Sequence, residues 1–110
     1  MSRIQQIEDF LKETPNDPFL HYALTMEYVK IGDTAKSLLG FENLVEKYPD
    51  YVGTYYHFGK FLEKENDSAR AQEIYQIGIQ VATKMRNMHA KGELMGALNM
   101  LLGFDEDEDC

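Results

Sequence analysis

The chain has 110 residues, 44% of them hydrophobic, which suits one folded domain and argues against wholesale disorder. Its formal net charge is −8, but the acidic run at residues 105–109 contributes five of these charges, and the rest of the chain carries only −3. Such a chain lacks the excess of positive charge that attracts nucleic acid or an anionic membrane surface, so we expect neither as a partner.

Residues that favour helices dominate the sequence, and strands rich in Val, Ile and Thr are missing. Apolar residues recur at spacings of three and four, as at Phe19, Tyr22, Met26 and Val29, which is the period of one helix face. In chain order the pattern predicts six helices, over residues 2–13, 17–31, 34–48, 51–65, 68–85 and 88–102.

Capping and turn residues separate these predicted helices. Asn16-Asp17-Pro18 supplies an N-cap followed by a first-turn proline, and Gly32-Asp33 supplies a C-cap glycine followed by the next N-cap. Asn66-Asp67-Ser68 repeats the second arrangement with asparagine as the left-handed residue, and Tyr48-Pro49-Asp50 ends one helix and opens another. Residues 84–88 contain neither proline nor glycine, so one long bent helix is the alternative there.

A repeat with a period of 34 residues, the offset from Leu24 to Phe58, runs through the sequence. A shift by this period places apolar residues on apolar residues and turn residues on turn residues. The matched pairs are Leu24 with Phe58, Tyr28 with Leu62, Asp33 with Asp67, Phe41 with Tyr75, Val45 with Ile79 and Pro15 with Pro49. The same shift relates Ile7 to Phe41 and Tyr55 to His89, so the period extends to both ends of the helical region without an insertion.

This pattern resembles the tetratricopeptide repeat, whose signature is W-x2-L-G-x2-Y, then A-x3-F, then P, and whose length equals the period seen here. The first repeat has His21, Leu24, Thr25, Tyr28, Ser37, Phe41 and Pro49 at these positions, and the second has Tyr55, Phe58, Gly59, Leu62, Ala71, Tyr75 and Thr83. The small residues of the signature stand where two helices approach closely. The second repeat departs from the signature at Thr83, where the family has proline.

The resemblance covers residues 2–102 and implies an all-α fold, a right-handed α-solenoid of antiparallel helix pairs with about six helices. Two full repeats follow a half repeat and precede a capping helix, so we expect a repeat domain over residues 1–103 and a disordered acidic tail over residues 104–110. Gly92 and Gly96 lie in the last helix, where each costs about 1 kcal/mol relative to alanine. We expect close packing against the preceding helix pair to compensate.

In the tetratricopeptide family the first helix of each pair lines a concave face that holds another protein. Carried over by register, this face would present Phe19, Tyr22, Met26, Val29 and Lys30 from one helix and Gly53, Tyr56, Lys60, Glu63 and Lys64 from the next. Tyr22 and Tyr56 are one period apart and would stand side by side, and tyrosines favour interfaces. The expected ligand is an extended or helical peptide with an apolar anchor and a nearby acid. Alternatively, Tyr22 and Met26 belong partly to the core and the face is shallow surface.

One subclass of the family clamps the C-terminal carboxylate of heat-shock chaperones with lysines and asparagines on this face. The corresponding places in this chain hold Tyr22, Met26 and His57, so the clamp is not matched and that partner is not expected.

The sequence contains no motif for catalysis, a metal or a cofactor, such as HExxH, CxxC, GxSxG or a phosphate-binding loop. We expect His21 and His89 to fill equivalent slots between helices as bulky aromatic residues, because stacked repeats would hold them too far apart to share a metal. Cys110 stands beside five carboxylates, which disfavour a reactive thiolate. We therefore expect a protein that is not an enzyme.

Cys110 is the single cysteine, so no intrachain disulfide is possible, and the acidic amphipathic start at residues 1–13 is unlike a signal peptide. No run of 18 apolar residues occurs, and we expect a cytoplasmic protein. The function that follows is a non-catalytic scaffold that binds a protein or peptide. The alternative is self-assembly into a homodimer through the terminal helices.

The acidic tail allows more than one interpretation. A run of like charges is usually a solvated end, but Phe104 could anchor the tail onto the lysines of the same chain or in the groove of a neighbouring molecule. Calcium binding is less expected, because carboxylates on a flexible end lack a fixed cage.

Overall fold

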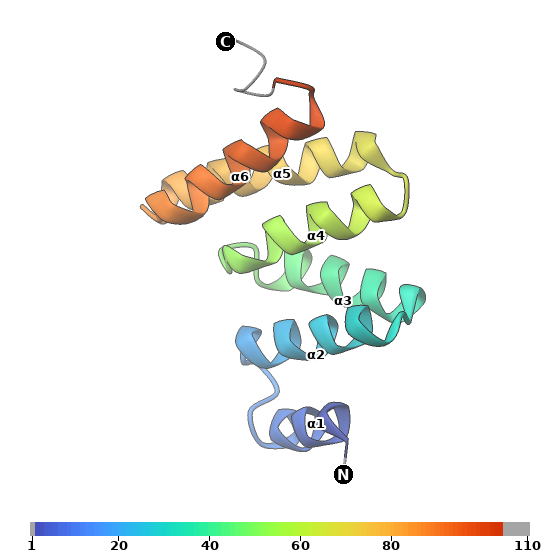
Figure 1. Ribbon diagram of the computed structural model, residues 1–110. Coiled ribbons are helices and arrows are strands. Elements are labelled where there is room, and N and C mark those ends of the chain that lie inside the picture. The colour runs from blue at the N-terminus through green and yellow to red at the C-terminus, as the bar shows by residue number, and fades with distance from the viewer. Residues whose placement is uncertain (1, 105–110) are drawn as a thin grey trace. The chain divides into compact units, whose positions relative to one another are not determined.

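The computed structural model describes residues 2–104, and over this range the chain forms six helices and no strand (Figure 1). In chain order they are α1 (Arg3–Glu13), α2 (Pro18–Ile31), α3 (Thr34–Lys47), α4 (Gly53–Lys64), α5 (Ser68–Lys84) and α6 (Met88–Leu101). The predicted all-α repeat fold is confirmed, and every helix bound lies within two residues of the bound expected from the sequence. The acidic run at residues 105–109 and Cys110 lie outside the described residues.

Short polar side chains start five of the helices; the caps at Asp17, Asp33 and Asp67 were expected from the sequence, and those at Ser2 and Asn87 were not. Each accepts a hydrogen bond from a backbone N–H in the first turn, which satisfies a donor that the helix itself leaves unpaired. The bonds run to Ser2 from Gln5 (3.1 Å), to Asp17 from Phe19 (2.9 Å), to Asp33 from Lys36 (3.1 Å), to Asp67 from Arg70 (3.2 Å) and to Asn87 from Ala90 (3.0 Å). The break between the last two helices therefore depends on Asn87, an N-cap that needs no neighbouring proline or glycine.

Four helices of residues 2–104 end next to a residue in the left-handed region, and after α6 this residue is Gly103, with φ 83°. Gly32 has φ 78° and Asn66 has φ 64°, and both are residues that the sequence analysis expected at these helix ends. Arg86, with φ 58°, makes the same reversal after α5, although its side chain makes this conformation unfavourable. The turn between α5 and α6 is thus the most strained of these four helix ends.

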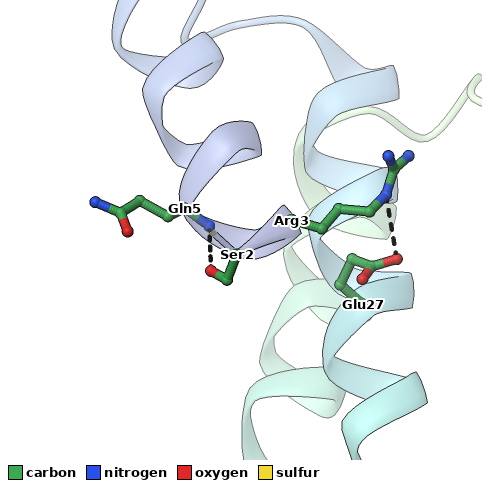
Figure 2. Close-up of polar contacts among 4 residues, drawn as sticks. All are labelled: Ser2, Arg3, Gln5 and Glu27. Atoms are coloured by element: carbon green, nitrogen blue, oxygen red, sulfur yellow. Dashed lines mark hydrogen bonds and ion pairs between the residues drawn. The ribbon is translucent and has the colours of Figure 1, made fainter.

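The chain divides into two compact units, one ending at Tyr51 and the other beginning at Val52. In the first unit, α2 packs against α1 and α3. Its buried core contains Ile7, Thr25, Ser37, Phe41 and Leu44. Figure 2 shows a polar contact that supports the packing of α1: Arg3 Nε lies 3.4 Å from the Glu27 carboxylate of α2, beside the Ser2 cap.

In the second unit, α5 packs against both α4 and α6, and α4 also touches α6. Large side chains dominate the buried set, which contains Tyr55, Phe58, Phe61, Leu62, Ile74, Tyr75 and Leu94 together with Ala71, Ala82 and Ala97. Burial of apolar area at about 25 cal/mol per Å² makes such a cluster the main source of stability for this unit.

Three glycines mark the closest helix contacts. A Cβ on Gly59 would lie 2.1 Å from the Tyr75 ring, and one on Gly78 would lie 2.5 Å from Cβ of Tyr55. In the first unit, a Cβ on Gly40 would lie 2.2 Å from Oγ1 of Thr25. Real Cβ atoms do not tolerate such distances, so these helix backbones approach each other because the side chain is missing.

The expectation for Gly92 and Gly96 is wrong. Nothing else in residues 2–104 lies within 4 Å of the place that a Cβ would take at either position. Both glycines are exposed on α6, so the preceding helix pair does not pack closely against them. The reason is their register: they stand one repeat period after Phe58 and Leu62, which are buried in α4, and no later helix of the described chain covers them.

Candidate functional site

The expected binding residues of the first unit lie on α2. Phe19 is 57% exposed, Lys30 is exposed, and Tyr22, Met26 and Val29 are half-buried. Spacings of three and four residues place this set, the α2 surface, on one side of the helix. An exposed aromatic ring beside half-buried apolar groups is a typical anchor region of protein interfaces.

Tyr22 is not isolated on the α2 surface. Its ring centroid lies 5.6 Å from that of Tyr51, with the two planes tilted by 50°. Burial raises the pKa of the Tyr22 phenol, and the nearby Tyr51 raises it further. Burial also raises the pKa of Tyr51, helped by the negative charge of Asp17. Both rings therefore stay neutral at physiological pH.

Tyr51 was missed by the sequence analysis. It belongs to the turn after α3, where its N–H donates to the Tyr48 carbonyl at 3.0 Å. The Tyr48 ring stacks on His21 at 5.5 Å, so the turn carries two aromatic rings onto the first turns of α2. A hollow of about 370 Å³ opens at this place, lined by Pro18, Lys47, Tyr48, Pro49, Asp50 and Tyr51. The available signal in the sequence was the pair of tyrosines that flank Pro49-Asp50.

The expected binding residues of the second unit lie on α4. Tyr56 and Glu63 are half-buried, and Lys60, Lys64 and Gly53 are exposed. Tyr56, Lys60, Glu63 and Lys64 share one side of the helix and form the α4 surface. The expectation that Tyr22 and Tyr56 stand side by side would join the two units, and it stays a prediction.

Lys60 is more strongly engaged than expected. Its ammonium lies 5.6 Å from the centroid of the Tyr56 ring and 3.8 Å from a carboxylate oxygen of Glu63. The Tyr75 hydroxyl donates a hydrogen bond to the same carboxylate. Burial raises the pKa of Tyr75, and the bond to Glu63 raises it further, because the carboxylate stabilises the protonated phenol. Glu63 thus balances Lys60, and Lys64 is a second exposed cation on the α4 surface.

The two histidines expected to act as bulky aromatic residues between helices differ in their surroundings. His21 does fill an inter-helix position: it stacks on Tyr48, and its Nε2 donates to the Pro15 carbonyl at 2.7 Å. The His89 side chain, by contrast, is 86% exposed and lies 3.6 Å from the Glu93 carboxylate. The expectation for His89 is wrong, because within the described residues α6 has no following helix against which the ring could pack.

His57 lies beside the α4 surface. Its ring meets Tyr56 edge to face, with centroids 5.4 Å apart. Burial lowers the pKa of His57, while the charge of Glu93 on α6 acts in the opposite direction. His57 is therefore a neutral, half-buried ring at physiological pH.

Residues 2–104 offer neither a metal site nor a membrane span. Within that range, no three side chains among His, Cys, Asp and Glu are placed to hold a metal ion. The same range includes no helix with the length and apolar content that a bilayer span requires.

Comparisons with known proteins connect this geometry to a family. No family model matches the chain, and no curated protein matches it. Among solved structures, the crystal structure of a tetratricopeptide repeat domain protein from Salinibacter ruber is 40% identical, covers 81% of this chain and 100% of that one, and superposes with a TM-score of 0.76. The solution structure of a tetratricopeptide repeat domain protein from Salinibacter ruber is also 40% identical, covers 84% and 93%, and gives 0.78.

A third structure shows the fold alone. The solution structure of a protein from Bordetella parapertussis is 20% identical, covers 99% of this chain and 95% of that one, and has a TM-score of 0.79. The repeat period, the six helices and the 40% identity to solved repeat domains lead to one assignment. The chain belongs to the tetratricopeptide repeat family.

Proposed function

We propose that the protein is a non-catalytic scaffold whose α2 and α4 surfaces bind an extended or helical segment of another protein. The observation that carries the proposal is Phe19, a large ring that is 57% exposed on α2 close to the Tyr22–Tyr51 pair. Folding leaves this ring in water, and a partner that covered it would gain apolar burial without ordering a long side chain.

The chemistry of the partner follows from the same surfaces. Phe19, Met26 and Val29 suit an apolar anchor, and methionine adapts its shape to different side chains. Lys30 on α2 and Lys64 on α4 are exposed cations. A segment with an apolar anchor and an acid nearby would satisfy both features. Because Lys60 is balanced by Glu63, we assign the larger electrostatic contribution to Lys30 and Lys64.

The test is capture of partners from a lysate of the source cell, with wild type and variants side by side. Tyr22→Ala, Tyr56→Ala and Lys60→Ala are combined in one variant, and Phe19→Ala alone removes the exposed ring with little effect on folding. The matched control is Glu73→Ala with Gln76→Ala and Gln80→Ala, three exposed positions on α5. Circular dichroism checks that each variant is folded.

A partner that the wild type and the α5 control capture, and that the triple variant and Phe19→Ala lose, supports the proposal. A partner held equally by all four proteins contradicts it and places the binding site elsewhere. Variants that change only the α2 surface or only the α4 surface then show whether one unit alone is sufficient for partner binding.

Self-assembly is a second candidate, favoured by the outer side of α6. Met88 is 64% exposed and Met95 is 44% exposed, so large apolar groups remain in water on this helix. A homodimer through α6 would cover them. Sedimentation at two protein concentrations decides: a mass that rises with concentration for the wild type, but not for Met88→Glu with Met95→Glu, supports the dimer, and a constant monomer mass excludes it.

A further inference from the structure

The first and last helices of the described chain are each one half of a repeat pair. α1 takes the place of α3 and α5 in the period, because Ile7 matches Phe41 and Tyr75, so it is a second helix that no first helix precedes among residues 2–104. α6 takes the place of α2 and α4, because His89 matches Tyr55, so it is a first helix that no second helix follows in the same range. Each of the two is therefore the type of helix that the other lacks.

The open side of α1 contains a hollow beside an exposed aromatic ring. The hollow measures about 480 Å³ and is lined by Gln6, Asp9, Phe10 and Glu13. Phe10 is 57% exposed, whereas Leu44, one period later on α3, is fully buried. One further period leads to Gly78 of α5, where a Cβ would lie 2.5 Å from Cβ of Tyr55 on α4. In the complete pairs this position thus belongs to the contact with the first helix, and on α1 it is uncovered.

A row of apolar side chains follows one side of α6. Met88 is 64% exposed, Met95 is 44% exposed and Leu102 is 40% exposed. They recur every two turns and therefore share one side of the helix, here called the α6 row. Leu94, one residue before Met95, points elsewhere and lies buried against Gly78 of α5. Apolar residues at this spacing form the seam along which one helix packs on another.

The chemistry of the two surfaces is complementary. Asp9 and Glu13 place carboxylates at the α1 hollow, and Lys12 lies 3.5 Å from Asp9. Lys91 stands between the two methionines of the α6 row, on the same side of the helix. A helix that laid this row on Phe10 would bring a cation toward two carboxylates. Methionine sulfur also packs favourably against an aromatic ring.

We propose that the α6 row of one copy packs into the α1 hollow of a second copy, with Phe10 as the central anchor. The contact would complete a repeat pair between two molecules and continue the interfaces that α2 makes with α3 and α4 makes with α5. Because α1 and α6 are different surfaces, the contact is heterologous and leaves one of each open for further copies. The inference rests on the self-assembly candidate but replaces its α6–α6 contact by an α1–α6 contact. It is independent of the α2 and α4 surfaces.

The experiment uses the full chain and two variants that each block one end. Phe10→Glu places a charge at the α1 hollow, and Met95→Glu places one in the α6 row. Sedimentation over a range of protein concentrations should show a mass that rises for the wild type, while each variant alone associates about tenfold more weakly or worse. An equal mixture of the two variants should form a dimer that does not grow, because the intact α6 of one fits the intact α1 of the other.

Matched controls carry the same new charge elsewhere on the same helices. Gln5→Glu changes an exposed residue of α1 that does not line the hollow, and Met100→Glu changes a residue that is 69% exposed on another side of α6. Both should associate as the wild type does, and circular dichroism checks that every variant is folded. Amide signals of the isotope-labelled wild type, followed by NMR with rising concentration, decide without any variant: Gln6 on α1 and Gly92 on α6 should both shift.

The proposal is wrong if Phe10→Glu associates as strongly as the wild type does, or if Gly92 shifts and Gln6 does not. Those results would indicate the α6–α6 homodimer instead. A mixture of the two variants that stays monomeric also contradicts the α1–α6 contact. A wild type that remains a monomer at every concentration excludes self-assembly as a whole, whereas partner capture by the α2 and α4 surfaces is tested separately.

Discussion

The helix pairs α2–α3 and α4–α5 share one repeat pattern but are packed around different small residues. In the first pair the glycine is Gly40, on the second helix, and it lies against Thr25. In the second pair the glycine is Gly59, on the first helix, and it lies against Tyr75. Gly59 matches Thr25 in the period, so the small residue changes helix between the two repeats. Close approach is thus achieved by a complementary pair of residues, and either helix can supply the smaller one.

The change in which helix carries the small residue is accompanied by a difference in burial between the two pairs. In the first pair, His21, Leu24 and Tyr28 remain half-buried, and a hollow opens beside Gly40. At the matching positions of the second pair, Tyr55, Phe58 and Leu62 are buried. The second unit therefore has the denser core, and the first unit has the more accessible surface. This division suits a scaffold in which stability and partner binding depend on different repeats.

The largest expected effect comes from giving α4 the residue that α2 has. Gly59→Thr would place a branched side chain into the Tyr75 ring, which is fully buried and cannot move aside. We expect the free energy of unfolding to fall by about 3 kcal/mol, at the upper end of the usual cost of overpacking. Urea titration followed by far-UV circular dichroism measures the change.

Gly92→Thr is the control for that substitution, because a Cβ at position 92 meets open space among the described residues. The same chemical change should there alter stability by only a few tenths of a kcal/mol. Equal losses at both positions would show that the Gly59–Tyr75 contact does not limit the packing of α4 on α5.

Most of the fold could be predicted from the sequence because its signals are local. Asp17, Asp33 and Asp67 cap helices through their own first turns, and Asn87 does the same where no proline or glycine marks a break. These contacts span two or three residues, so the order of residues along the chain already contains them. The helix bounds could be predicted for the same reason.

The site was harder to predict because its contacts join different elements. The state of Lys60 depends on Glu63, whose carboxylate is held by Tyr75 from the next helix. Tyr51 contacts Tyr22 of α2 through a turn in which its N–H donates to the Tyr48 carbonyl. The helical period places Tyr22 and Lys60 on the expected faces, but it does not specify which neighbours they acquire.

A second expected effect concerns Thr54, at the start of α4. Its side chain is fully buried, and its Oγ1 has no hydrogen-bond partner among the described residues. The matching residue of the first repeat is Leu20, which is apolar. Thr54→Val replaces the hydroxyl by a methyl group of similar size, and we expect it to stabilise the fold by about 1 kcal/mol. Urea titration measures the gain, and a loss of stability would mean that the hydroxyl has a partner in solution, such as a buried water.

A smaller gain in stability is expected from a substitution on α6. Gly92 and Gly96 match Leu24 and Tyr28 in the first repeat and Phe58 and Leu62 in the second. Within the described chain no helix follows α6, and glycine there avoids large apolar side chains that would be left in water. Gly96→Ala should raise the free energy of unfolding by roughly 0.5–1 kcal/mol, since alanine is the better helix former and meets no neighbour. A decrease would indicate that a partner or a second copy needs the close approach that glycine permits.

The smallest expected effect distinguishes the two units by pH. His57 of α4 matches Ala23 of α2, so a titrating ring stands only in the second unit at this position. Burial lowers the pKa of His57 from its ordinary value of 6.5, which means that the folded protein resists a proton that the unfolded chain accepts. The stability gained from the neutral ring is therefore present above pH 6.5 and is lost as the pH falls below that value. His57→Gln should therefore make the loss of stability below pH 6.5 less steep, measured as urea midpoints across the acidic range. An unchanged slope for His57→Gln would show that Glu93 compensates fully for the burial of the ring.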